Sequence, residues 1–282
     1  MLLAHSPEEL MSLLLVYTKI MNYYKWKVLV CVILLIAVPI LVTCQIQYTQ
    51  AASVTGLDQE MTGETKVILY QQLQNADHFE QMTYFFNGIS FSVMGLVAMG
   101  AILLIRVTEE SRMRKRVLCS PVRERTLLQE ELLVSLLLIP FVWLIHMVTA
   151  CIYVGSLILS YQGIMMLINI VMLSITGIGL AFLSTRITKD RITMGVTLIA
   201  VIVIMCFVSG GFVPSYYLGN TARECAVFTP VYWYVRANEL IRGFYFSEYT
   251  TLLEILKCFG MQLVFAVMYY VAAYADQKRR ES

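Results

Sequence analysis

Six apolar stretches, each long enough to cross a membrane, constrain the fold of this chain more than any other feature of its sequence. A transmembrane helix needs roughly 17–25 mostly apolar residues. Only 14% of the 282 residues are charged, whereas a soluble domain has about 25%. The sequence therefore predicts an all-α polytopic membrane protein with six transmembrane helices. We expect these helices at 28–46, 85–105, 132–154, 164–183, 194–212 and 258–275.

The distribution of Lys and Arg predicts the orientation of the helices. Cytoplasmic connections carry an excess of basic residues, and sixteen of the 21 Lys and Arg fall in alternate connections. Those connections are 1–27, 106–131, 184–193 and 276–282. Both termini are therefore expected to be cytoplasmic, which agrees with an even number of spans. The predicted location is the cell membrane, as a multi-pass protein.

Two further segments flank the first predicted span. Residues 1–27 are expected to form a cytoplasmic amphipathic helix on the inner membrane surface, because Ser6, Pro7 and Glu9 are typical of a helix start. The alternative is an extension of the first span. Residues 47–83 form a polar outer segment with few large apolar groups, so they make at most a small subdomain. Residues 28–282 thus constitute one six-span domain.

The cytoplasmic loop 106–131, RVTEESRMRKRVLCSPVRERTLLQEE, is long and dense in both signs of charge. Its acidic and basic residues can pair along a helix, which Ser-Pro interrupts before a second helix enters the third span. Such a helix–break–helix is suited to receiving force from a cytosolic partner. The alternative is a solvated, positive-inside loop. The residues expected to couple to a partner are Glu109, Glu110, Arg112, Arg116, Ser120, Pro121 and Arg123.

A second distinctive segment, 209–255, follows the fifth predicted span on the opposite side of the membrane. It begins SGGFVPSYYLGNTARECAVFTPVYWYVRANELIRG, where glycines and prolines break the helix. Its aromatic side chains suit the headgroup layer. We therefore predict a bent, partly re-entrant cap on the outer face. The residues expected at an outer gate are Gly210, Gly211, Pro214, Pro230, Tyr232 and Trp233.

The sequence contains none of the common catalytic or nucleotide-binding motifs considered below. No GxxxxGK[ST] phosphate loop, no Gly-rich dinucleotide-binding turn and no GxSxG or HExxH motif occurs. The seven cysteines are scattered without metal-ligand spacing, so no metal site is predicted and the chain is not expected to be an enzyme. The net charge of +2 gives no indication of a nucleic-acid partner.

His146 is the only ionisable residue deep inside a predicted span, which makes it a candidate intramembrane polar site. The alternative is a neutral imidazole hydrogen-bonded to a neighbouring helix. Because no Asp, Glu, Lys or Arg shares the membrane middle, an ion-coupled carrier is disfavoured. In the fourth span, Gly177 and Ala181 form a small-xxx-small pair that suits helix packing within the chain or between two copies.

The loop and the cap together resemble the type-2 permeases of ABC exporters, over roughly residues 85–275. In the loop, the resemblance lies in a Glu-bearing helix followed by Arg, two apolar residues, any residue and Ser-Pro-Val. In the cap, it lies in Ser-Gly-x-Phe-x-Pro, a helix, and a second Pro before an aromatic run. The matching residues are Glu110, Arg116, Leu118, Ser120, Pro121, Val122, Gly210, Gly211, Pro214, Pro230, Tyr232 and Trp233. The chain departs from the family at Arg112-Met113, where Gly-Thr is common, and in its short outer segment.

The resemblance implies a half-transporter in the lipid bilayer of a bacterial cell membrane. Two six-span subunits, either two copies of this chain or this chain and a paralogue, would enclose a path. Each would rest on a separate cytosolic ABC ATPase, which binds ATP and Mg, so this chain binds no cofactor itself. The ATPase would push on 106–131 and the N-terminal helix, and the cap would be the external gate. The alternative function is a membrane sensor or accessory protein that signals through the same loop without transport.

Overall fold

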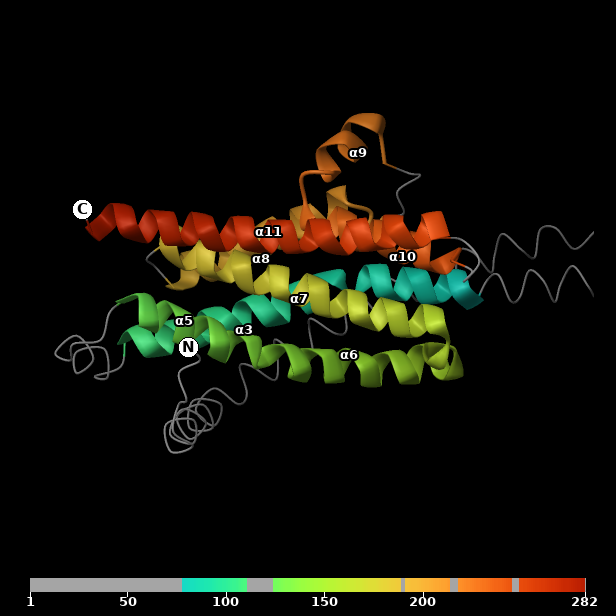
Figure 1. Ribbon diagram of the computed structural model, residues 1–282, viewed down its shortest axis with the longest axis horizontal. Coiled ribbons are helices and arrows are strands. Elements are labelled where there is room, and N and C mark those ends of the chain that lie inside the picture. Colours follow the sequence, from blue (N-terminus) through green and yellow to red (C-terminus); the bar gives the residue numbers. More distant parts are fainter. Residues whose placement is uncertain (1–77, 111–123, 189–190, 214–217, 245–248, 282) are drawn as a thin grey trace, which may run out of the picture.

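The computed structural model describes residues 78–110, 124–188, 191–213, 218–244 and 249–281 (Figure 1). The regular structure within these ranges is entirely helical. The predicted N-terminal helix 1–27, the first span 28–46 and the outer segment as far as residue 77 lie outside them. The elements are α3 (Ser90–Glu110), α5 (Glu124–Leu136), α6 (Leu138–Val154), η2 (Gly155–Leu159), α7 (Tyr161–Ile187), α8 (Arg191–Val208), α9 (Asn220–Ala226), α10 (Pro230–Arg242) and α11 (Tyr249–Glu281).

Four helices are long and apolar enough to cross a membrane, which is compatible with a membrane protein. They contain the predicted spans 85–105, 132–154, 164–183 and 258–275. The four helices are His78–Ile105, Glu130–Leu159, Tyr161–Ile187 and Tyr249–Asp276.

The fifth predicted span, 194–212, differs from the structure at its outer end. Its apolar helical part is only Thr193–Val208. At 1.5 Å per residue this part is about 24 Å long, shorter than the roughly 30 Å hydrocarbon core of a bilayer. The apolar sequence continues past Val208, but the helix does not.

The second predicted span also begins earlier than expected. Residues 78–84, inside the segment predicted as a polar outer region, are already helical, and these turns pack like a core helix. Met82 and Phe85 are completely or almost completely buried there. The Tyr84 hydroxyl donates to Glu80 Oε1 at 2.8 Å, one turn away.

The long helices run antiparallel to their neighbours in sequence (Figure 1). The end of α3, the start of α5, the end of α7 and the end of α11 lie at one end of the bundle. The described parts of three connections rich in Lys and Arg therefore share that end.

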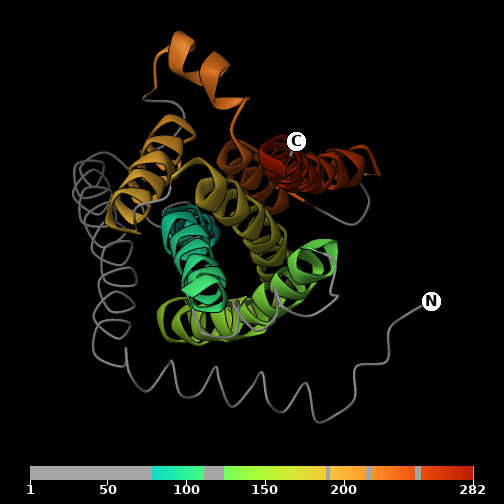
Figure 2. The ribbon, with the colours of Figure 1, turned by 90° about the vertical axis from the view of Figure 1, so that its left-hand side faces the viewer.

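Viewed end-on, α3 and α7 occupy the middle of the bundle, with α6 below them and α11 to the right (Figure 2). Burial agrees with this arrangement. In their most apolar windows, 78% of the His78–Ile105 helix and 72% of α7 are buried, against 22% in the helices Glu130–Leu159 and Tyr249–Asp276. The peripheral helix Glu130–Leu159 exposes an apolar stripe, as expected for contact with lipid. Its side chains are Leu133, Leu137, Phe141, Leu144, Val148 and Ile152.

Small residues let α7 approach two helices closely. An ideal Cβ built on Gly177 would lie 3.4 Å from the Met94 carbonyl oxygen of α3. An ideal Cβ on Gly179 would lie 2.9 Å from the Ala266 carbonyl oxygen of α11. Gly177 therefore allows α7 to pack against α3 within the chain. At Gly179 the backbones of α7 and α11 are so close that a side chain would clash with the backbone of α11.

We predict that Gly179→Ala lowers the free energy of unfolding by about 1–3 kcal/mol, because its Cβ forces α7 and α11 apart. Gly260→Ala is the matched control, since an ideal Cβ on Gly260 of α11 meets nothing within 4 Å. Thermal unfolding of both variants in the same detergent measures the difference. Equal midpoints for the two variants would contradict close packing at Gly179.

Candidate functional site

Helix α8 ends in a turn that requires glycine. Gly210 has a φ of 88°, in the left-handed region that L-residues avoid. The Gly211 N–H donates to the Cys206 carbonyl at 2.9 Å, which closes a Schellman-type cap with Gly210 at its left-handed position. A Cβ on Gly211 would lie 3.0 Å from Ser90 Oγ and 3.1 Å from the Cys206 carbonyl oxygen. Gly210 therefore provides the left-handed backbone angle, and Gly211 allows the turn to lie close to Ser90.

This helix end lies inside the bundle and not at its outer surface. The backbone carbonyl of Asn87 is 3.5 Å from the ideal Cβ position of Gly211. Asn87 lies nine residues after His78 in the same helix, so the turn is about 14 Å along that helix from the first residue that the structure describes. Ser209 is 3% exposed. The irregular backbone is therefore covered by protein, as it must be at membrane depth.

The chain returns to the same place at the start of α10. Thr229 caps this helix, with its side chain accepting from the Tyr232 N–H, and Pro230 occupies the first turn. Thr229 Oγ1 donates to the Ala226 carbonyl at 2.7 Å. Because a hydroxyl has one proton, Ser209 Oγ must be the donor in its 2.6 Å contact with Thr229 Oγ1. One polar cluster thus joins the end of α8 to the start of α10.

A ladder of buried side-chain amides holds α10 in the bundle. Asn238 Nδ2 of α10 donates to Asn87 Oδ1 at 2.9 Å. Asn169 Nδ2 of α7 donates to Asn238 Oδ1 at 2.8 Å and to the Tyr234 carbonyl at 3.0 Å. Gln262 Nε2 of α11 donates to Asn169 Oδ1 at 2.8 Å. We call Asn87, Asn238, Asn169 and Gln262 the amide ladder; it joins four helices, and Asn169 donates two hydrogen bonds within it.

Two further contacts fix α10 beside the ladder. The Tyr234 hydroxyl donates to the Phe86 carbonyl at 2.9 Å, and the ring of Tyr234 is fully buried. Asn238 and Ala237 are also fully buried. A 13-residue helix therefore lies among the long helices, and its buried polar side chains Tyr234 and Asn238 are hydrogen-bonded to them.

The C-terminal end of α10 is held by an ion pair and by a hydrogen bond to a backbone carbonyl. Arg242 Nη1 lies 3.6 Å from Glu80 Oε1, and both side chains are partly exposed. The Tyr161 hydroxyl donates to the Phe244 carbonyl at 2.7 Å. These contacts join the C-terminal end of α10 to the start of α7 and to the helix His78–Ile105.

The two aromatic residues predicted at the gate lie on the less buried side of α10. Tyr232 and Trp233 meet edge to face, with ring centroids 5.4 Å apart. Trp233 Nε1 donates to the Val227 carbonyl at 3.0 Å, which ties α10 to the end of α9. Gly210, Gly211, Pro230, Tyr232 and Trp233 thus belong to one segment, whereas Pro214 lies outside the described residues.

His146 occupies a different site, between α6 and α3, and is 1% exposed. Its Nδ1 lies 2.7 Å from the Val142 carbonyl, which can only accept, so Nδ1 carries the proton. The Ser92 hydroxyl then donates to Nε2 at 2.8 Å. Both ring nitrogens have partners, and this geometry favours a packing role over a free intramembrane group.

Of the predicted coupling residues, only Glu109 and Glu110 belong to the part of the chain that the structure describes. Glu109 and Glu110 form the end of α3, whereas Arg112, Arg116, Ser120, Pro121 and Arg123 lie outside the described residues. The last residue of that loop, Glu131, is close to α7: its Oε2 is 3.8 Å from Arg186 Nη2. Both side chains are 15% exposed, so this pair is better shielded from water than a surface ion pair.

The amide ladder was not predicted from the sequence. A signal was available, since Asn87, Asn169 and Gln262 lie within apolar stretches and polar residues at such positions pack against other helices. Among the described residues, no cluster of His, Cys, Asp and Glu could hold a metal ion.

Comparison with protein-family models, curated proteins and solved structures finds no match for this chain.

We predict that Gly210→Ala lowers the free energy of unfolding by about 1–2 kcal/mol, because alanine must adopt a left-handed backbone. The matched control is Gly219→Ala, in the same segment. Gly219 has an ordinary φ of −62°, and an added Cβ meets nothing within 4 Å. Thermal unfolding in detergent measures both variants. A Gly210→Ala protein as stable as the control would contradict the proposed cap.

Proposed function

We propose that this chain is the transmembrane permease subunit of an ABC exporter, moving a substrate out across the cell membrane with energy from a separate cytosolic ATPase. Two features support this proposal. The loop and cap motifs occur in the order of the type-2 export permeases, and the cap's second helix packs against three of the four apolar helices of membrane-spanning length, His78–Ile105, Tyr161–Ile187 and Tyr249–Asp276.

The proposal depends most on the interrupted helix after α8. Helix α8 stops inside the bundle at Gly210, and α10 continues from there toward the outer end. In this proposal α8 is the inner part of the fifth of six spans, and α9 and α10 form the re-entrant outer cap. An interrupted helix whose ends meet inside a bundle can change its angle at the break without unfolding a complete span, which is a property that a gate requires.

The inner end of the bundle offers a route by which force could reach the spans. Helix α5 is separated from α6 at Leu137, because Pro140 has no N–H to bond the carbonyl four residues earlier. Glu131 of α5 pairs with Arg186 at the end of α7. A push on loop 106–131 from the cytosolic side would therefore move α5 against α7, the central helix. In this proposal ATP and Mg bind to the partner ATPase, a second permease subunit completes the path, and both termini are cytoplasmic.

The coupling role predicts that charge reversal at Arg112, Arg114 and Arg116 releases the ATPase. Vanadate-sensitive ATP hydrolysis that purifies with the tagged chain is expected to fall roughly tenfold or more, since several charge-assisted contacts are lost together. The matched control reverses Lys278, Arg279 and Arg280, three basic residues in the C-terminal connection.

Unchanged ATP hydrolysis in the loop variant would contradict the coupling role. Export and signalling are separated by a second measurement on the unmodified chain. An exporter moves a compound across vesicles only when ATP is present, and a sensor does not.

A further inference from the structure

We propose that α11 pivots on α7 where Gly179 meets Ala266, and that its N-terminal half swings away from α7 and α10 and exposes the amide ladder to water. Helix α11 lies at the edge of the bundle, where it packs against α7 and α10 (Figure 2). Only 22% of its most apolar window is buried, so it can move without disturbing the central helices. The motion needs no ATPase, so this proposal is independent of the export function.

The seam, by which we mean the contact of α11 with α7 and α10, differs along its length. At the middle of α11 the two backbones are close, since an ideal Cβ on Gly179 would lie 2.9 Å from the Ala266 carbonyl oxygen. One turn further along, the rings of Phe182 and Tyr270 meet edge to face with centroids 6.0 Å apart. Four residues before Ala266, the buried side of α11 instead carries the amide of Gln262. The close contact suits a pivot, and the polar part suits an opening.

The amide ladder ends in an acceptor that lacks a donor. Both protons of Asn169 Nδ2 are used, by the Tyr234 carbonyl and by Asn238 Oδ1. Asn169 Oδ1 therefore receives the N–H of Gln262, which fixes the orientation of that amide. Gln262 Oε1 is then buried without a hydrogen bond to any residue that the structure describes. Such a carbonyl raises the free energy of the closed seam, and water that reaches it removes this cost.

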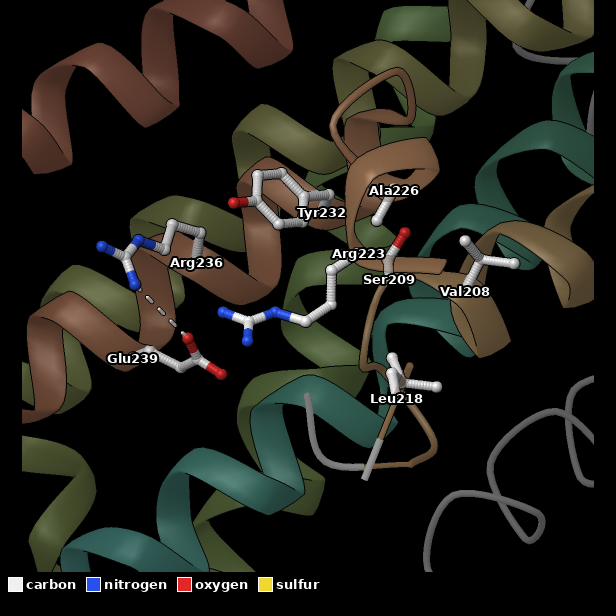
Figure 3. Close-up of a pocket in the computed structure, with 8 residues that line it drawn as sticks. All are labelled: Val208, Ser209, Leu218, Arg223, Ala226, Tyr232, Arg236 and Glu239. Atoms are coloured by element: carbon white, nitrogen blue, oxygen red, sulfur yellow. Dashed lines mark ion pairs between the residues drawn. The ribbon is translucent and has the colours of Figure 1, made fainter. Parts of the chain in front are cut away.

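Water comes close to the ladder on two helices. On α10, Arg236 and Glu239 lie 4.0 Å apart, and their side chains are 48% and 31% exposed (Figure 3). The ladder residue Asn238 lies between them in the sequence. On α11, Lys257 is exposed and precedes Gln262 by five residues, about 7.5 Å along the helix. Charged side chains at such positions require water or a polar partner, so a small displacement of α11 is enough to hydrate the ladder.

A hydroxyl of α7 holds the seam closed. Thr176 Oγ1 donates to the Gln262 carbonyl of α11 at 3.1 Å and shares its proton with the Met172 carbonyl of its own helix, also at 3.1 Å. Thr149 of α6 donates in the same way to carbonyls of its own helix. Thr176→Val therefore removes a bond across the seam, and Thr149→Val is its matched control.

Modification of the native cysteines tests this proposal on the full chain in lipid nanodiscs. The probe is a charged, membrane-impermeant maleimide, and peptide mass spectrometry measures its attachment at each cysteine. Exposed Cys225 should react at once, whereas Cys206, which is buried and lies beside Ser90 of α3, should stay unmodified. Cys258 is buried one turn before Gln262, so it should react slowly, each time α11 opens.

Thr176→Val should raise the rate at Cys258 about threefold, the usual effect of one hydrogen bond between membrane helices, and Thr149→Val should leave it unchanged. Cys258 as unreactive as Cys206 would overturn the proposal. A rate at Cys258 that ignores Thr176→Val would also overturn it, because the reaction would then report fraying of the helix start. An equal rise at Cys206 would show general loosening of the bundle, with the same consequence.

The position of the pivot is tested with Ala273→Cys, in the C-terminal half of α11, where Ala273 is 4% exposed. This thiol should stay unmodified, because the helix remains packed beyond the pivot. Modification as fast as that of Cys258 would show that α11 leaves the bundle as a whole, which would overturn the pivot. Thermal unfolding in the same nanodiscs verifies that all variants are folded.

Discussion

The rest of this structure depends on one constraint: a helix that stops inside an apolar bundle leaves polar groups that water cannot reach. An unpaired amide or carbonyl in such surroundings costs several kcal/mol. The Gly210–Gly211 turn satisfies the backbone at the end of α8, and the Ser209–Thr229 contact joins it to the start of α10. The amide ladder then provides side-chain partners across four helices. These bonds add to the packing of the buried apolar side chains of α10.

The same requirement explains why α7 combines small and polar residues. Gly177 and Gly179 bring the backbones of α3 and α11 close to α7. Asn169 lies on that helix between them and the outer end, and it uses both donors and its acceptor. Close approach shortens the distances that the ladder must cover. Packing and hydrogen bonding on α7 therefore support each other, which is how helices associate when lipid removes the hydrophobic driving force between them.

The sequence predicts the long helices well because their apolar length is a local property. It does not predict where α8 ends. Phe207 and Val208 are followed by further apolar and small residues, so a hydropathy profile continues past the turn at Gly210. The glycines and Pro230 did indicate a break in this segment. The amide ladder is harder to predict, since Asn87 and Asn238 are 151 residues apart, and Asn169 and Gln262 are 93 apart. The sequence shows that each amide residue is present, but its hydrogen-bond partner depends on how the helices pack.

The most direct test of this account is a double-mutant cycle between Asn169 and Asn238, measured by reversible unfolding in mixed micelles. The variants are Asn169→Leu, Asn238→Leu and the double variant. If the ladder holds α10 against α7, the two substitutions should couple by about 1 kcal/mol, near the upper part of the range for hydrogen bonds between membrane helices. Strictly additive effects would contradict the account, because α10 would then be held by packing alone.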